Sequence, residues 1–282
     1  MGNKDWTTYF IDKNTFSNSH QVSMSGKTDK TTFYVSGGFD QENGILSKIV
    51  KNDSYKRYNI RLKGTYDVTD WFTISNNTSY VTTERLKPGY FWSSDMSMFY
   101  NLAPQDHDVN PDGTWANNAA GRLMARLNNG GEDIRKYDRI QSTFGGELNL
   151  LKNLLKVNAN YSFVKGTEDY NWFETKYSIG FGPNDVREEG NSKAYRTFAT
   201  DYYSVVDIYG TLNWLNNRHQ FTSILGFNQE YSQYNWLVAE REGLISTQLP
   251  TVALATGEMN VNESFKDWAI RGLFYRLNYI YD

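Results

Sequence analysis

Cysteine is absent from this chain of 282 residues, and proline and histidine are scarce, with five and three residues. The absence of cysteine excludes a disulfide scaffold and a cysteine-based zinc site. No apolar run approaches the roughly 20 residues that a membrane-spanning helix needs, which excludes a helical span. Charge of one sign is also lacking, because 29 basic and 32 acidic residues leave a net charge of −3. This balance argues against a nucleic-acid partner.

Catalytic motifs are missing as well. The three histidines, His20, His107 and His219, lie far apart in the chain, and none belongs to an HExxH pair. There is no GxSxG nucleophile motif, no P-loop and no dinucleotide-binding glycine fingerprint. We therefore predict that the protein is not an enzyme and uses no cofactor. The first residues, MGNKDWTTYF, lack the apolar core of a secretory signal. If the protein is exported, the chain is expected to be a fragment or to have lost its start.

Aromatic residues are abundant, at 16% with 21 tyrosines, and together with 22 glycines they favour β-structure. The stretch YKRYNIRLKGTYDV (55–68) places Ile60 and Leu62 at even positions and Arg61 and Lys63 at odd positions. Because side chains alternate between the two faces of a strand, this strand has one apolar and one charged face. The pattern recurs in about nine segments, near 21–26, 33–40, 55–68, 71–84, 143–150, 155–163, 206–214, 220–228 and 273–279.

Short and long connections alternate between these strands. Tight turns are predicted near 69–70, 152–153 and 216–218, and long links over 41–53, 85–136, 170–195 and 242–264. Such asymmetry is typical of an outer-membrane barrel, which has short periplasmic turns and long extracellular loops. Trp71, Trp214 and the pair Tyr279 and Tyr281 fall beside the turns, where an aromatic girdle would lie. A soluble all-β sandwich or lipocalin-like barrel would also show the alternation, so both classes stay open at this point.

Three segments carry a family resemblance. Residues 21–80 contain QVSMSG, then TTFYVS, QENGIL, YKRYNIR and WFTISNN in order, preceded by Asp5 and Trp6. The segment LAPQDHDVNPDGTW (102–115) and the final FYRLNYIYD (274–282) complete the match. In this order they resemble the SusC/RagA family of TonB-linked outer-membrane transporters of Bacteroidetes. The resemblance spans nearly the whole chain, although each motif alone is loose.

The resemblance implies an all-β fold, namely a portion of an antiparallel transmembrane β-barrel, located in the cell outer membrane. It implies import of glycan fragments or oligopeptides, with a SusD-like surface lipoprotein, the TonB complex and outer-membrane lipid as partners. Barrels of this kind have 22 strands, and the family's plug domain and TonB box have no match here. We therefore expect residues 1–282 to be a partial barrel, with 1–19 as a lead-in after the plug and 20–282 as strands and loops. The alternative function is a soluble carbohydrate-binding module that uses loop aromatics.

Candidate site residues follow from these two faces and from the loops. Charged residues expected to face the lumen are Arg57, Arg61, Lys63, Glu147, Lys156 and Arg276. Aromatic residues expected in loops, where they would stack on sugars or contact a partner protein, are Tyr90, Phe91, Trp92, Trp115, Trp172 and Phe173. The segment DVNPDG offers a weak calcium candidate in Asp108, Asn110 and Asp112. Because Ala119 stands where the closing glutamate belongs, a turn is the better interpretation.

Overall fold

A single twisted antiparallel sheet dominates the computed structural model, which describes all residues except 1–2, 51–52, 90, 92, 152–153 and 282, with side chains omitted at 93–96. Within the described residues the sheet has nine strands in the order β1-β2-β3-β4-β5-β6-β9-β10-β11. These are β1 (Ser17–Lys27), β2 (Thr31–Asn43), β3 (Ser54–Thr69), β4 (Phe72–Pro88), β5 (Gly131–Leu150), β6 (Leu155–Glu174), β9 (Lys193–Asn216), β10 (His219–Glu242) and β11 (Met259–Tyr281). The predicted fold class is confirmed.

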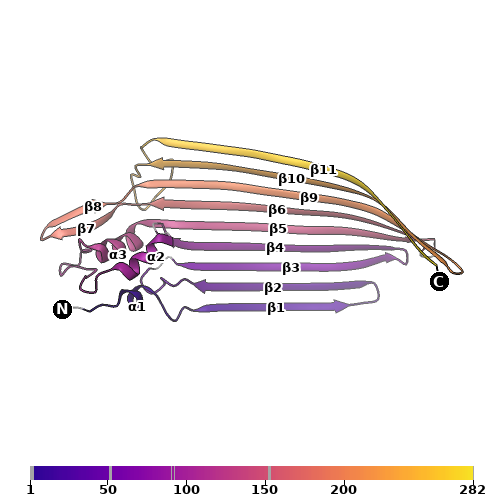
Figure 1. Cartoon of the computed structure of the whole chain (residues 1–282), viewed down its shortest axis with the longest axis horizontal. Helices are drawn as coiled ribbons and strands as arrows, with labels where there is room; N and C mark the ends of the chain where they lie inside the picture. The colour runs from indigo at the N-terminus through magenta and orange to yellow at the C-terminus, as the bar shows by residue number, and fades with distance from the viewer. Residues whose placement is uncertain (1–2, 51–52, 90, 92, 152–153, 282) are drawn as a thin grey trace.

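The long connections gather at one end of the sheet and the tight turns at the other (Figure 1). The loop end carries three helices and a small hairpin: α1 (Trp6–Phe10), α2 (Ser93–Asn101), α3 (Ala119–Asn129), β7 (Tyr177–Gly182) and β8 (Asp185–Glu189). The sequence did not predict these helices. No helix in the described part of the chain has both the length and the hydrophobicity to cross a membrane.

The strands extend farther towards the loops than the alternation predicted. The long links shrink to 89–130, 175–192 and 243–258, so residues 131–136, 170–174 and 259–264 belong to strands. In the ends of β5 and β6 polar side chains occur on both faces, which removes the hydrophobic alternation while leaving the backbone pairing intact. β5 begins at Gly131, whose φ of 109° and close approach to the Phe173 carbonyl exclude a side chain there.

The register places the large apolar side chains on one face. Residues belong to this apolar face if direct cross-strand pairs or a spacing of two along a strand connect them. Its members include Met24, Val35, Leu62, Ile74, Phe144, Val157, Ile208, Phe227 and Leu273. Several stay open to the surroundings, with Leu62 45% and Leu273 81% exposed. A soluble sheet buries such a face against a second layer. The described residues supply no layer over the middle of this face, so the soluble alternative is not favoured.

The turns advance along the strand direction from one edge of the sheet to the other. The β1–β2 turn begins beyond Thr32, which cross-strand pairs connect to Gly145 of β5, whereas the β9–β10 turn begins at Asn216, four residues beyond the level of Leu150. The two turns are displaced from each other by about 30 Å along the strands. They are separated by six strand spacings, which together measure about 29 Å across the sheet. If all turns lie at one membrane surface, the strands tilt by about 45°, which is the tilt of a membrane barrel. The sheet thus has the geometry of a barrel wall.

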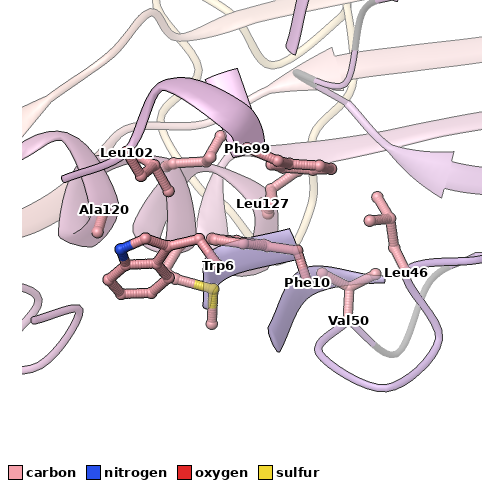
Figure 2. Close-up of a cluster of buried hydrophobic side chains, with 10 residues drawn as sticks. Trp6, Phe10, Leu46, Val50, Phe99, Leu102, Ala120 and Leu127 are labelled. Carbon is pink, nitrogen blue, oxygen red and sulfur yellow. The ribbon is translucent and has the colours of Figure 1, made fainter. Parts of the chain in front are cut away.

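A small hydrophobic core holds the loop end together (Figure 2). We call it the loop core; its buried members are Trp6, Phe10, Leu46, Val50, Phe99, Leu102, Ala120, Leu123, Met124 and Leu127. They come from four separate segments, and the Phe10 and Phe99 rings stack with centroids 4.6 Å apart. Asn118 caps α3, since its side chain accepts a hydrogen bond from the Gly121 amide. The loops at this end of the sheet are therefore packed against one another.

Candidate functional site

The face opposite the apolar one is polar, and it carries all six charged residues predicted to line a lumen. Arg57, Arg61 and Lys63 of β3 share it with Glu147 and Lys156, whose ion pair has an N–O distance of 2.8 Å. Arg276 of β11 joins them through its pair with Ile224. Their placement on one common face agrees with the prediction, while their exposure to a lumen stays a prediction.

The middle of the polar face is organised by hydrogen bonds between neighbouring strands. The Tyr203 hydroxyl donates a hydrogen bond to the Glu230 carboxylate at 2.8 Å, and the Asn228 side-chain amide donates one to the Asp207 carboxylate at 2.7 Å. Such pairs fix the side chains of β9 and β10 in place. By contrast, no ion pair or hydrogen bond between described residues engages the charged groups of Arg57, Arg61 and Lys63. The β3 side of this face therefore presents free positive charge.

Aromatic rings and ions meet where the polar face reaches the loops. The ring of Tyr195 contacts the rings of Tyr170 and Trp172 edge to face, at centroid distances of 5.7 and 5.9 Å. The Trp172 indole N–H donates to the Gly89 carbonyl at 2.7 Å, which ties β6 to the start of the long 89–130 loop. The Arg135 guanidinium lies over the Tyr170 ring, 4.5 Å from its centroid.

A buried carboxylate completes this arrangement. Asp133 is 4% exposed, forms an ion pair with Lys87 at 3.0 Å and accepts a hydrogen bond from the Tyr170 hydroxyl at 3.1 Å. Its other oxygen, Oδ1, accepts no hydrogen bond from the described residues, and the Arg85 guanidinium lies 4.0 Å away. We call Lys87, Asp133, Arg135, Tyr170, Trp172 and Tyr195 the aromatic–ion cluster. Aromatic rings beside charges of both signs suit a sugar or a peptide, which combine apolar faces with hydrogen-bonding groups.

Sequence reasoning found only part of this cluster. Trp172 was expected in a loop, and the structure corrects this because it lies in β6, as does Phe173. The partners Lys87, Asp133 and Tyr195 were missed because the predicted links 85–136 and 170–195 contained them. A usable signal was present: charged or aromatic residues at spacings of two continue directly from each predicted strand.

The other loop aromatics have mixed positions. Tyr90 and Trp92 lie outside the described residues. Phe91 packs against the loop core and stacks near Phe99, with ring centroids 6.3 Å apart. Trp115 also packs on the loop core, and its indole N–H donates to Asn129 at 3.0 Å. Phe173 is only 8% exposed, so its ring has little surface left for a partner.

Trp115 and Phe173 nevertheless come together around one cavity of about 460 Å³. Its wall is formed by amide, hydroxyl and charged side chains from three loops, including Asn128, Lys176 and Thr247. A cavity with aromatic and amide walls at the loop end suits a polar ligand segment. The predicted loop aromatics are therefore partly structural, and two of them also border a pocket.

The calcium candidate is occupied by the protein's own contacts. Asp108 forms an ion pair with Lys4 at 2.8 Å and accepts a hydrogen bond from the Tyr9 hydroxyl at 2.6 Å. Asp112 accepts from the Thr114 amide at 3.0 Å, which is a turn contact. Among the described residues no group of three histidine or acidic side chains could hold a metal ion. DVNPDG thus forms a turn, which is the interpretation that the sequence favoured because the closing glutamate of a calcium loop is absent.

Asp108 and Tyr9 have shifted pKa values because they share this contact. Burial of Asp108 opposes its ionisation, but the hydrogen bonds from Lys4 and Tyr9 outweigh burial and lower the pKa of Asp108. Burial and the neighbouring Asp108 carboxylate raise the pKa of Tyr9 to about 12. The Lys4 ammonium also lies 3.5 Å from the Tyr9 ring centroid. This contact ties the segment before β1 to the 102–118 loop.

The sheet, its sidedness and its loops can be compared with known proteins. No model of a known protein family matches the chain. TonB-dependent receptor P3 of Formosa agariphila is 22% identical over 99% of this chain and 28% of its own length. The RagAB peptide transporter superposes with a TM-score of 0.72 at 16% identity, over 100% of this chain and 32% of that chain. Its "open-open" state gives 0.73 at 16% identity, over 99% and 31%.

The chain has the fold of a TonB-dependent receptor barrel. The resemblance to SusC/RagA proteins and the outer-membrane location predicted from it are confirmed. The chain spans less than a third of the length of the relatives that it matches. Those relatives are a receptor and a transporter, and neither name denotes an enzyme. In a barrel of this fold the apolar face of the sheet is the lipid-facing side.

Proposed function

We propose that the chain forms part of the barrel wall of a TonB-dependent outer-membrane transporter that imports glycan fragments or oligopeptides. The observation that carries the proposal is the sheet itself: one apolar face, one polar face, turns that follow a line at about 45° to the strands, and all long loops at one end. We further propose that residues 1–19 lead into the barrel and 20–282 form its strands and loops. Catalysis is not part of this function.

The partners proposed are a SusD-like surface lipoprotein, the TonB complex and outer-membrane lipid, with no nucleic acid. A lipoprotein would meet the loop end, where the loop core gives the loops a defined shape. Cargo entering there would pass the aromatic–ion cluster first, because the cluster lies on the polar face next to the loops. RagAB, which shares this fold, is a peptide transporter, and its cargo supports oligopeptides as one class to test here.

Uptake measurements in cells test the proposal. A strain that lacks the gene is complemented with the full-length protein, and uptake of fluorescent oligopeptides and of labelled oligosaccharides is measured with and without functional TonB. We expect uptake of one cargo class to be lost both on deletion of the gene and on loss of TonB. Unchanged uptake of both classes after deletion would refute the transport function.

The aromatic–ion cluster is tested by the double substitution Trp172→Ala and Tyr195→Ala. Losing both rings should lower uptake about thirtyfold, because each ring contributes roughly 1 kcal/mol of contact and the two together about 2 kcal/mol. Phe198→Ala is the matched control, since Phe198 is an exposed aromatic residue of β9 on the lipid-facing side. Surface levels are measured for all variants. Normal uptake by the double variant would remove the cluster from the pathway while leaving transport intact.

A further inference from the structure

On three strands a cation follows the end of the continuous apolar run on the loop side, and we call this line the border. Lys56 of β3 stands two residues beyond Tyr58, Lys165 of β6 two residues beyond Phe163, and Arg271 of β11 two residues beyond Leu273. Because side chains alternate, each cation is on the lipid-facing side of its strand and is the next lipid-facing side chain after the apolar run.

The register shows that these cations lie on one slanted line. Cross-strand pairs connect Lys56 to the level of Lys136 on β5, Lys165 to Ile140 and Arg271 to Phe144. From one cation to the next, the position therefore shifts by four residues along the strand, which is about 13 Å. The same move crosses three strand spacings, which is about 14 Å. This slope corresponds to about 45°, the same tilt that the turns indicate independently. All three cations consequently lie at one depth relative to the membrane, about 20 Å apart.

Acidic neighbours on this side are already engaged. Glu84 pairs with Lys136 at 3.1 Å, and Asp169 pairs with Arg196 at 2.8 Å. Asp138 accepts the Tyr80 hydroxyl proton at 2.7 Å. The charged groups of Lys56, Lys165 and Arg271 form no hydrogen bond or ion pair with the described residues.

Two further carboxylates, Asp267 and Glu263 on β11, share the lipid-facing side. They lie four and eight residues beyond Arg271 towards the loops, outside the border. Apart from the Asp138 carboxylate, which lies close to the same depth, the charges nearest the apolar face that have no ion-pair partner among the described residues are positive.

Tyrosines define the same border. Tyr58, Tyr80, Tyr161 and Tyr202 face the lipid side near it, and the hydroxyls of Tyr161 and Tyr202 lie 2.9 Å apart. Tyrosine at a membrane interface places its ring in the apolar region and its hydroxyl among the headgroups. The cations next to this girdle lie at the depth of lipid headgroups, and long basic side chains extend readily to that level.

We propose that Lys56, Lys165 and Arg271 bind phosphate groups of the lipid in the leaflet on the loop side. A spacing of about 20 Å is too wide for one phosphate or one small anion to bridge two of them. Equal depth along a tilted wall fits a planar partner, and a membrane surface bearing phosphates is such a partner. The inference depends on the membrane position of the sheet and not on the transport of any cargo.

The test uses full-length protein in neutral detergent, with bisphosphorylated lipid A and dephosphorylated lipid A as probes and native mass spectrometry as the readout. The variant carries Lys56→Gln, Lys165→Gln and Arg271→Gln. Its control carries Lys13→Gln, Lys48→Gln and Arg187→Gln, which removes the same charge from exposed positions at the loop end. We expect wild type and control to prefer the phosphorylated probe, and the border variant to lose at least about tenfold of that binding.

Three outcomes would overturn the proposal. They are equal binding of both probes by wild type, unchanged binding by the border variant, and an equal loss in the control. A fourth measurement separates lipid from free anion: if inorganic phosphate displaces the probe at equal phosphate concentration, the site is not one for lipid. If the triple variant assembles poorly, the single variant Lys165→Gln is measured instead, and it should lose part of the binding of the phosphorylated probe. Cargo uptake is scored separately, so failure of the transport proposal would leave this result standing.

Discussion

Leu62 and Lys63 are neighbours in β3 that lie on opposite faces of the sheet. Replacing the apolar residue with a charged one, and the charged residue with an apolar one, tests which face contacts lipid. The apolar side of β3 runs from Tyr58 to Val68. That stretch is about 34 Å long along the strand. At a tilt of about 45° it spans about 24 Å along the membrane normal, which matches the hydrocarbon band of about 25 Å in outer-membrane barrels. Leu62 lies about 10 Å below one border, close to the midplane.

Leu62→Arg should therefore cost about 2–4 kcal/mol of folding free energy, since it places a charge near the bilayer midplane. Val68→Arg, at the turn-side border, should cost at most about 1 kcal/mol because its guanidinium reaches water. Lys63→Leu is the matched control at the depth of Leu62 on the polar face. It introduces no charge into lipid and should change stability by less than about 1 kcal/mol.

The assay is reversible unfolding of the full-length protein from lipid vesicles, followed by tryptophan fluorescence over a guanidinium titration. The expected order of destabilisation is Leu62→Arg first, with Val68→Arg and Lys63→Leu both mild. Equal losses for Leu62→Arg and Lys63→Leu would show that the register of β3 is wrong. Equal losses for Leu62→Arg and Val68→Arg would instead refute the depth worked out from the tilt.

Two further predictions concern the loop end. Phe10→Ala removes a fully buried ring stacked on Phe99 and should lower the free energy of opening the loop core by about 3–5 kcal/mol; amide hydrogen exchange should accelerate in residues 4–12, and unchanged rates there would contradict the packing. The lowered pKa of Asp108 adds stability that is present above the ordinary carboxyl value and lost as pH falls through the lowered one. The pKa of Tyr9, raised to about 12, adds stability that is present below pH 10 and lost as pH rises towards 12. Protection of residues 4–12 against exchange should accordingly fall at both extremes. Asp108→Asn should weaken the acidic limb, to which Asp5 also contributes because hydrogen bonds from Thr7 and Thr8 lower its pKa to about 2.

The sequence alone determined the strands that cross the membrane and the face on which each residue lies. Period-two alternation is a local property, so Ile60, Leu62 and Lys63 could be assigned to faces without knowing their neighbours. The tight turns are likewise marked by asparagine and aspartate, and Asn217 indeed adopts a left-handed conformation with φ 51°. These local signals were sufficient for the fold class.

The strand ends outside the membrane lack this alternation, because both of their faces can contact water and neither has to be hydrophobic. The extension of β6 through Trp172 was missed for that reason. The helix α3 had a signal, since Asn118 caps it and Leu123 and Leu127 are spaced by four residues. A helix of 11 residues inside a long link was nevertheless outweighed by the strand pattern around it.

Tertiary structure decided which distant residues meet. The loop core joins Trp6, Leu46, Phe99 and Leu127, and no local pattern relates these four positions. The same holds for the aromatic–ion cluster, where Asp133 and Tyr170 come together only because β5 pairs with β6 in one register. Whether cations on separate strands share one membrane depth depends on that register and on the tilt. A sequence specifies the face of each side chain, but depth is a property of the assembled sheet.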